Sequence, residues 1–193
     1  MMATPADAAT MIATLGGKPE LVTLALDVLL RQGEVVDEVI VVHPSTANPR
    51  IRASLQRLLA EFAQNRYTGR PCKLSRAPLK LGDVELDDIR TDAEAAATQL
   101  TVLALIAGQK QRNRKLHLCL AGGRRMMALL VMSAAALLCD HRDRLWHVHG
   151  SDAFKGHVAR DGLLHAAADA EFRLVPIPIV PWGTYFPALR AIA

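Results

Sequence analysis

Two glycine-containing segments hold the residues whose types and spacing suit the binding of an anionic ligand. AGGRR (121–125) and TLGGKP (14–19) each follow an apolar run and place a cation directly after a glycine pair. Glycine lets the backbone turn sharply and approach a ligand. Backbone N–H groups at the start of a helix favour an anion, and arginine and lysine add donors that suit phosphate oxygens. Together the two segments indicate a site for a ligand with several phosphates.

The two segments have limited specificity on their own. Neither matches GxGxxG or GxxxxGK[ST], so the sequence does not predict a dinucleotide or nucleoside triphosphate fold. An alternative interpretation is that the glycines only turn a strand tightly into a helix, with Arg124 and Arg125 in solvent. The elements around the segments must therefore decide whether they form one site.

Strands and helices are expected to alternate along the chain. Apolar runs predict strands, and apolar residues at helical spacing predict the helices between them. Strands are expected at 9–15, 37–43, 115–120 and 144–150, with a further candidate at 72–76. Helices are expected at 19–33, 48–62, 91–112 and 123–139. A hairpin or long loop is expected at 79–89, an extended sheet edge at 172–182, and no element is assigned to 151–171, which would suit a lid or a dimer element.

Three helix starts have recognisable signals. Pro19 suits a first helical turn, where its missing N–H has no cost. Asn48 and the following proline fit a cap and a first helical residue. Thr91 and Glu94 have the spacing of a capping box.

This order of elements predicts an α/β fold. A mostly parallel sheet would lie between two helical layers, in a Rossmann-like three-layer sandwich. We expect one domain over residues 9–193 after a flexible segment at 1–8. Such sheets bind ligands at the carboxyl ends of their strands, so 14–19 and 121–125 are expected at the same edge.

The composition excludes several classes of protein. With 51% hydrophobic residues in 193, the chain is globular, and its net charge of +4 suits an anionic ligand without requiring nucleic acid. Its three cysteines are isolated, which argues against a disulfide framework. No basic segment followed by an apolar run opens the chain, and the apolar stretch 126–139 is shorter than the ~20 residues of a membrane span. We expect a cytoplasmic protein.

Four segments resemble a known family. Residues 12–42, 86–97, 116–127 and 144–154 occur in the order found in CRISPR-associated Rossmann-fold (CARF) domains. The chain is most similar to the branch with CRISPR ring nucleases and the sensor halves of CRISPR ancillary ribonucleases. The resemblance extends from about Met11 to Trp182, and the combination of segments is more specific than any one of them.

This resemblance implies a homodimer that binds a cyclic oligoadenylate, most often cyclic tetra-adenylate, across its two-fold axis. It implies no cofactor, no metal, no DNA and no membrane. In the family, the turn after the first strand and the later Gly-Gly turn line the pocket. By position these correspond to Thr14, Leu15, Gly16, Gly17, Lys18, Gly122, Gly123, Arg124 and Arg125.

A further segment of the family corresponds to Asp88, Arg90 and Thr91, which the resemblance places close to the ligand. An alternative interpretation is structural. Thr91 would then only cap a helix, and Asp88 would pair with Arg90 or another neighbour.

The implied reaction needs little dedicated chemistry. A ribose 2′-OH of the ring attacks its own 3′-phosphate and leaves a linear product with a 2′,3′-cyclic phosphate. Lys18, Arg124 and Arg125 are the candidates for stabilising the added negative charge, and Thr14 for orienting the hydroxyl. His43 is the histidine nearest the binding edge, although a structural role is an alternative. The ring size is not fixed by the sequence.

Two other functions remain open. A sensor would bind the same ligand intact and regulate a partner protein or transcription. A nucleotide-binding enzyme of general metabolism is disfavoured, because no acidic ribose-binding residue follows a GxGxxG turn.

Ribonucleases of the family carry a second, helical HEPN domain with an Arg-x4–6-His motif. Arg142 to His147 and Arg160 to His165 match this spacing, the second within a helix-like segment. A HEPN site needs a paired helical domain, and none is expected after Trp182. We therefore expect neither match to be a nuclease centre.

Histidines near the carboxyl half suggest a metal site only weakly. His147 and His149 alternate on an expected strand, and His141, His157 and Asp152 are close in sequence. Their spacing matches no standard zinc signature, so no metal site is expected.

Overall fold

Six strands pair into one sheet. A computed structural model describes residues 8–165 and 172–191, so all but the last residue of the expected flexible segment 1–8 lie outside the described residues. The strand order is β10-β9-β8-β1-β2-β5. The strands are β1 (Ala9–Thr14), β2 (Val36–His43), β5 (Lys73–Pro78), β8 (Lys115–Leu120), β9 (Arg144–Gly150) and β10 (Phe172–Ile177).

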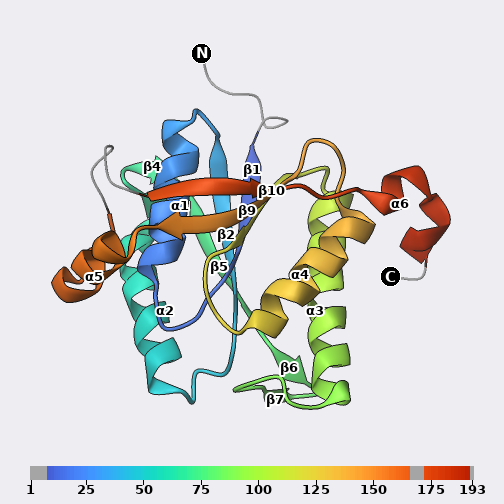
Figure 1. Cartoon of the computed structure of the whole chain (residues 1–193), viewed down its shortest axis with the longest axis horizontal. Coiled ribbons are helices and arrows are strands. Elements are labelled where there is room, and N and C mark those ends of the chain that lie inside the picture. Colours follow the sequence, from blue (N-terminus) through green and yellow to red (C-terminus); the bar gives the residue numbers. More distant parts are fainter. Residues whose placement is uncertain (1–7, 166–171, 192–193) are drawn as a thin grey trace.

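Helices connect these strands, with two short ribbons beside them (Figure 1). The α-helices are α1 (Glu20–Arg31), α2 (Pro49–Glu61), α3 (Asp92–Gln111), α4 (Arg125–Leu138), α5 (Asp152–Asp161) and α6 (Trp182–Tyr185). The 3-10 helices are η2 (Ala63–Asn65) and η3 (Pro187–Ala191). One ribbon pairs β3 (Arg66–Tyr67) with β4 (Arg70–Pro71), and the other pairs β6 (Lys80–Leu81) with β7 (Val84–Glu85).

The sheet has the topology that the alternation of elements predicts. β1 pairs in parallel with both β2 and β8, and the parallel set is completed by β5 and β9. Only the edge strand β10 is antiparallel, beside β9. From β1 the chain first adds β2 and β5 on one side and then β8 and β9 on the other, so the direction of strand addition changes between β1 and β8. In sheets of this kind, ligands bind beyond the carboxyl ends of the strands where this change occurs. The prediction of a Rossmann-like α/β fold is confirmed.

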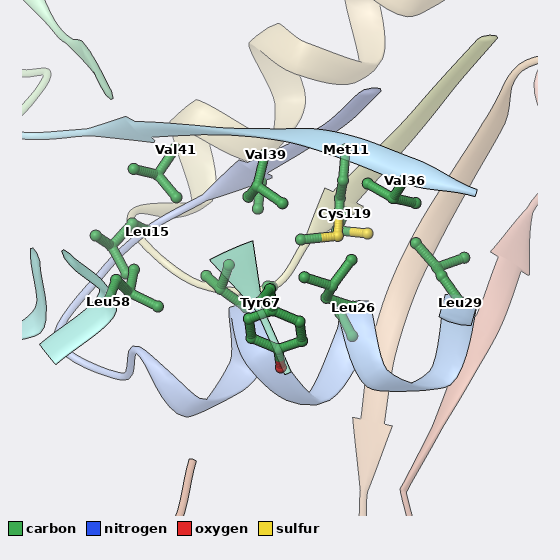
Figure 2. Close-up of a cluster of buried hydrophobic side chains, with 14 of the residues drawn as sticks. Met11, Leu15, Leu26, Leu29, Val36, Val39, Val41, Leu58, Tyr67 and Cys119 are labelled. Carbon is green, nitrogen blue, oxygen red and sulfur yellow. The ribbon is translucent and has the colours of Figure 1, made fainter. Parts of the chain in front are cut away.

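Alternating side chains of the strands build a core on each face of the sheet. Met11 and Ala13 of β1 pack with α1 and α2, and Ile12 packs with α3 and α4. α1 and α2 accordingly lie on one side of the sheet in Figure 1, and α3 and α4 on the other. Figure 2 shows the first core, where Leu26 of α1 and Tyr67 lie under the strands.

The predicted helix signals are mostly confirmed. The Asn48 side chain accepts a hydrogen bond from the Arg50 backbone N–H at 3.0 Å, and Thr91 and Glu94 form the reciprocal capping box. Pro19 lies one residue earlier than expected, at the N-cap of α1. The segment 79–89 contains the β6–β7 hairpin.

The unassigned segment 151–171 begins with a helix. The Ser151 hydroxyl accepts from the Phe154 N–H at 3.1 Å and caps α5, which ends at Gly162 with a φ of +61°. His165 therefore lies beyond the helix, which corrects the helix-like interpretation of the Arg160–His165 match. Residues 166–171 are outside the described part of the chain.

Within residues 8–165 and 172–191, no three His, Cys, Asp or Glu side chains gather as a metal site would require. None of the helices in those ranges has the length and apolar character needed to cross a membrane. Cys72, Cys119 and Cys139 are all buried free thiols. Burial raises the pKa of each thiol, that of Cys72 to about 12.

Candidate anion-binding site

The two glycine turns meet at the carboxyl edge of the sheet. A Cβ atom on Gly16 would lie 2.6 Å from the backbone nitrogen of Gly123, closer than real Cβ contacts. A Cβ on Gly122 would lie 3.3 Å from the Gly16 nitrogen, and Gly123 has a φ of +89°. The turns after β1 and β8 thus touch through their backbones, which only glycine at position 16 permits. Because β1 and β8 are neighbouring strands, the fold itself brings these turns together.

Thr14 and Leu15 hold the glycine turn after β1 in place. The Thr14 hydroxyl accepts a hydrogen bond from the Gly122 N–H at 3.3 Å, so it links the two turns. The Leu15 N–H donates to the Val42 carbonyl at 2.8 Å, which continues the sheet by one residue. Thr14 is 1% exposed and Leu15 is fully buried. Both side chains support the turns from beneath.

A cavity of about 350 Å³ opens beside the joined turns. Its lining combines both glycine pairs, the start of α1, the start of α2 and the segment before α3. The lining residues are Gly16, Gly17, Lys18, Leu21, Pro44, Asn48, Arg50, Ile51, Asp87, Gly122, Gly123 and Arg124.

Three cations and one carboxylate line this cavity. Lys18 follows the first glycine pair, Arg124 follows the second, and Arg50 enters from α2. A Cβ on Gly17 would lie 2.9 Å from the Arg50 Nε, so the guanidinium packs directly on the glycine backbone. Asp87 is the carboxylate. The excess of positive charge favours an anionic ligand.

Two of the three helices that begin at the cavity, α1 and α4, lack side-chain caps. α1 starts after Pro19 and α4 after Arg124, and neither residue provides a side-chain hydrogen bond to the helix. In contrast, α2, α3 and α5 are capped by Asn48, Thr91 and Ser151. The uncapped first turns leave N–H groups for which a bound anion is a suitable partner.

Carboxylates from the segment before α3 orient two arginines. The Arg124 Nε lies 3.2 Å from an oxygen of Asp88, which leaves the two terminal nitrogens of the guanidinium without a described partner. The Arg90 guanidinium lies 3.0 Å from Asp87. This hydrogen bond and its charge hold the pKa of Asp87 below the usual range. Asp88 pairs more closely with Arg124 than with Arg90, which is 3.8 Å away.

Seven of the residues singled out in the sequence do not line the cavity: Thr14, Leu15, His43, Asp88, Arg90, Thr91 and Arg125. Thr91 caps α3, as the structural alternative for it predicted. Arg125 is the exposed first residue of α4 and is not part of the lining. Arg90 acts on Asp87 from outside the lining. Leu15 is buried below the first turn.

His43 is placed as the structural alternative predicted. It is 2% exposed, and its Nδ1 lies 2.7 Å from the Pro44 carbonyl. Its Nε2 has no hydrogen-bond partner among the described residues. Burial lowers the pKa of His43, so the ring is neutral near pH 7. It lies under the cavity edge while the next residue, Pro44, lines the cavity.

Arg50 and Asp87 are the charged lining residues that sequence reasoning missed. Arg50 has a signal, because it lies in the first turn of the helix that follows β2 and the carboxyl ends of parallel strands share one edge. Asp87 has a weaker one, since it lies in an irregular segment whose path the sequence does not predict.

Comparison with known proteins gives a family match. The sequence profile described as CRISPR-associated protein NE0113 matches residues 18–193. No curated protein matches the chain. A solved structure of a type III CRISPR defence DNA nuclease activated by cyclic oligoadenylate is similar, with a TM-score of 0.46 and 16% identity. The similarity covers 77% of this chain and 20% of that one, so this chain spans about a fifth of that protein's length.

Proposed function

Because the chain belongs to the CRISPR-associated NE0113 family, we propose that its cavity binds a cyclic oligoadenylate, with cyclic tetra-adenylate the expected ring. We propose further that it cleaves the ring without a metal, to linear products with a 2′,3′-cyclic phosphate. This reaction would switch off type III CRISPR signalling. The resemblance of four segments to CARF domains supports the same ligand.

The backbone contact between the two glycine turns carries the proposal. Gly16 and Gly123 touch, and Lys18, Arg50 and Arg124 surround the cavity beside them. This arrangement offers both uncapped helix starts and three cations to one ligand. A ligand with several phosphates within one small ring matches that distribution of charge.

The proposed reaction uses a nucleophile from the ligand itself. The 2′-oxygen forms a bond to the 3′-phosphorus, and the bond from that phosphorus to the 5′-oxygen of the next nucleotide breaks. The proton of the 2′-OH passes to solvent, and the leaving 5′-oxygen takes a proton from solvent. Lys18 and Arg124 would stabilise the charge that builds on the phosphate oxygens. Thr14 is assigned a positioning role, because its hydroxyl holds the Gly122 N–H.

A second copy of the chain would complete the site. The face of α4 exposes Met126, Leu129 and Met132, which are 41%, 54% and 37% exposed. Arg124 precedes the same helix at the cavity. A two-fold dimer packed on this face would bury the apolar side chains and bring two cavities to one ring.

A sensor that binds the ring without cleaving it is the second candidate function. Thr14 and His43 are both buried, and neither side chain lines the cavity. Among the described lining residues, Asp87 is the only carboxylate, and its low pKa makes it a weak base. The absence of a strong base from this lining favours the sensor.

Incubation of the protein with cyclic tetra-adenylate in EDTA, followed by chromatography, tests both candidates. Conversion of the ring to a 2′,3′-cyclic phosphate product supports the ring nuclease, and tight binding of an unchanged ring supports the sensor. Arg124→Ala and Lys18→Ala should weaken binding or cleavage at least tenfold while the oligomeric state is unchanged. Wild-type behaviour of both variants would contradict the position of the site, and failure of the native protein to bind any cyclic oligoadenylate would refute both functions.

A further inference from the structure

A second, smaller cavity adjoins the anion-binding cavity. It has a volume of about 80 Å³ and lies between α1, β9, α5 and β10. Lys18 and Leu21 line both cavities, so the two share a wall. Its lining residues are Lys18, Glu20, Leu21, Leu24, Val148, Gly150, Phe154, Val158 and Phe172. A ligand whose phosphate lies near Lys18 can therefore extend into this second space.

The walls of the second cavity suit a flat aromatic ring. Leu24 and Val158 are buried aliphatic side chains. Phe154 of α5 and Phe172 of β10 have their ring centroids 5.8 Å apart, with the planes inclined by 45°. Aromatic side chains stack on nucleobases without requiring a particular base. The shape and polarity of the walls thus favour a base over another phosphate.

Glu20 gives the second cavity one hydrogen-bond acceptor. The residue is 8% exposed and lines this cavity but not the anion-binding one. Its carboxylate oxygens have no hydrogen bond or ion pair with another described residue and are accessible to solvent, so a ligand in this cavity can reach them. Its place in the first turn of α1 explains why a negative charge is favourable there.

We propose that this cavity binds a nucleobase that carries an exocyclic amine, and that Glu20 accepts the hydrogen bond of that amine. The proposal rests on the proposed function, in which the ligand supplies adenines. Glu20 would then select the base, while Lys18, Arg50 and Arg124 hold the phosphates. Base selectivity and phosphate affinity would belong to different residues and can be measured separately.

Entry of a base requires α5 to move outward. An apolar cavity of roughly 150 Å³ is large enough for a benzene ring, and this cavity has about 80 Å³. α5 supplies Phe154 and Val158 and is held at its end by a hydrogen bond from Arg57 to the Gly162 carbonyl. We therefore expect amide hydrogen exchange in α5 to change when the ligand binds.

The test compares two cyclic tetranucleotides, one of adenosine and one of purine riboside, which lacks the amine. The wild-type protein should bind the adenosine ring about tenfold more tightly. Glu20→Leu should reduce this ratio to near one, and Glu20→Gln, which keeps a neutral acceptor, should give an intermediate ratio. Arg124→Ala should weaken both rings equally, which distinguishes loss of phosphate contacts from loss of base selection.

Several outcomes would overturn the proposal. Equal binding of the two rings by the wild type, or an unchanged ratio in Glu20→Leu, would show that Glu20 does not read the amine. If neither ring binds, the proposed function fails, and 5′-AMP at millimolar concentration then tests the cavity alone. Shifts in the NMR signals of the Phe154 and Phe172 rings with 5′-AMP, and smaller shifts with purine riboside 5′-monophosphate, would retain the base site. No shifts would refute it.

Discussion

A single methyl group at position 16 would separate the two turns of the site. The Cβ of Gly16→Ala would lie 2.6 Å from the Gly123 nitrogen, so one backbone segment must shift. We expect binding of cyclic tetra-adenylate to weaken at least tenfold and the melting temperature to fall. Calorimetric titration and thermal unfolding measure the two effects.

Gly108→Ala is the matched control for that substitution. Gly108 lies inside α3, and its added Cβ would meet nothing within 4 Å. Alanine in a helix interior should stabilise the protein by about 0.5–1 kcal/mol and leave ligand affinity unchanged. Equal effects of both substitutions on affinity would contradict the contact between the turns.

Arg50 and Arg52 can be compared to separate the effect of a positive charge on ligand affinity from the effect of its position in the cavity. Both are exposed on the first turn of α2, but only Arg50 lines the cavity. Arg52 donates to the Thr46 and Ala47 carbonyls at 3.0 and 3.1 Å. Arg50→Ala should weaken ring binding about tenfold and reduce its dependence on salt, because one phosphate contact is lost.

Arg52→Ala removes the same charge and should change affinity less than threefold. Affinities measured at two salt concentrations compare the variants. If the two substitutions weaken binding equally, the cavity attracts its ligand through net charge alone, and the assignment of Arg50 is wrong.

At the scale of elements, the sequence predicts best where local chemistry decides the structure. The Asn48 cap and the Thr91–Glu94 capping box each depend on residues three or fewer positions apart, and both are confirmed. The sequence does not predict α5, because a glycine interrupts this helix and its apolar residues are few. The strands β3 and β4 have two residues each, which is too short to show an alternation of apolar and polar residues.

The candidate site is likewise predicted only in part from the sequence. Glycine pairs at strand ends predict the two turns, because the rule that places ligands at carboxyl ends needs only strand order. Whether Thr14 and His43 face the cavity depends on the direction of each side chain at the last strand residues. Arg50 and Asp87 reach the cavity through packing of α2 and an irregular segment, which sequence spacing does not encode.

The loop after α5 is attached to α1 and α2 by His165. The His165 Nδ1 lies 2.9 Å from Asp27, and its Nε2 lies 3.0 Å from Glu61. The Tyr67 hydroxyl donates to Asp27 at 2.7 Å, and burial raises the pKa of Tyr67, so this group stays protonated. Burial alone would lower the pKa of His165, but the hydrogen bonds and charges of Glu61 and Asp27 raise it overall.

A raised pKa in the folded state makes this attachment dependent on pH. The stabilisation by protonated His165 is complete below the unfolded pKa of about 6.5 and is lost as pH rises through the folded value. Urea unfolding should therefore show a loss of stability in the wild type as pH rises above about 6.5. His165→Gln should flatten that dependence, and an identical slope in the variant would exclude His165 as its source.

At the scale of the whole molecule, the exposed face of α4 is expected to hold two copies together. Leu129→Glu would place a charge in the centre of this apolar face, where the residue is 54% exposed. We expect a monomer in light-scattering measurements and at least a tenfold loss of affinity for cyclic tetra-adenylate, since each ring would contact two cavities.

Leu59→Glu is the control on the other side of the sheet. Leu59 lies on α2 and is 46% exposed, so the substitution is chemically matched. This variant should remain dimeric with unchanged affinity. A wild-type protein that is monomeric with and without ligand would contradict the dimer, as would a dimer that survives Leu129→Glu.

The buried thiols also make the two layers of the molecule separately observable. Cys119 belongs to the core beneath α1 and α2, and Cys139 to the core beneath α3 and α4. An alkylating reagent reaches either sulfur only after its own layer loosens. The order in which the two become labelled in mild denaturant would reveal which half of the sandwich unravels first, without any introduced probe.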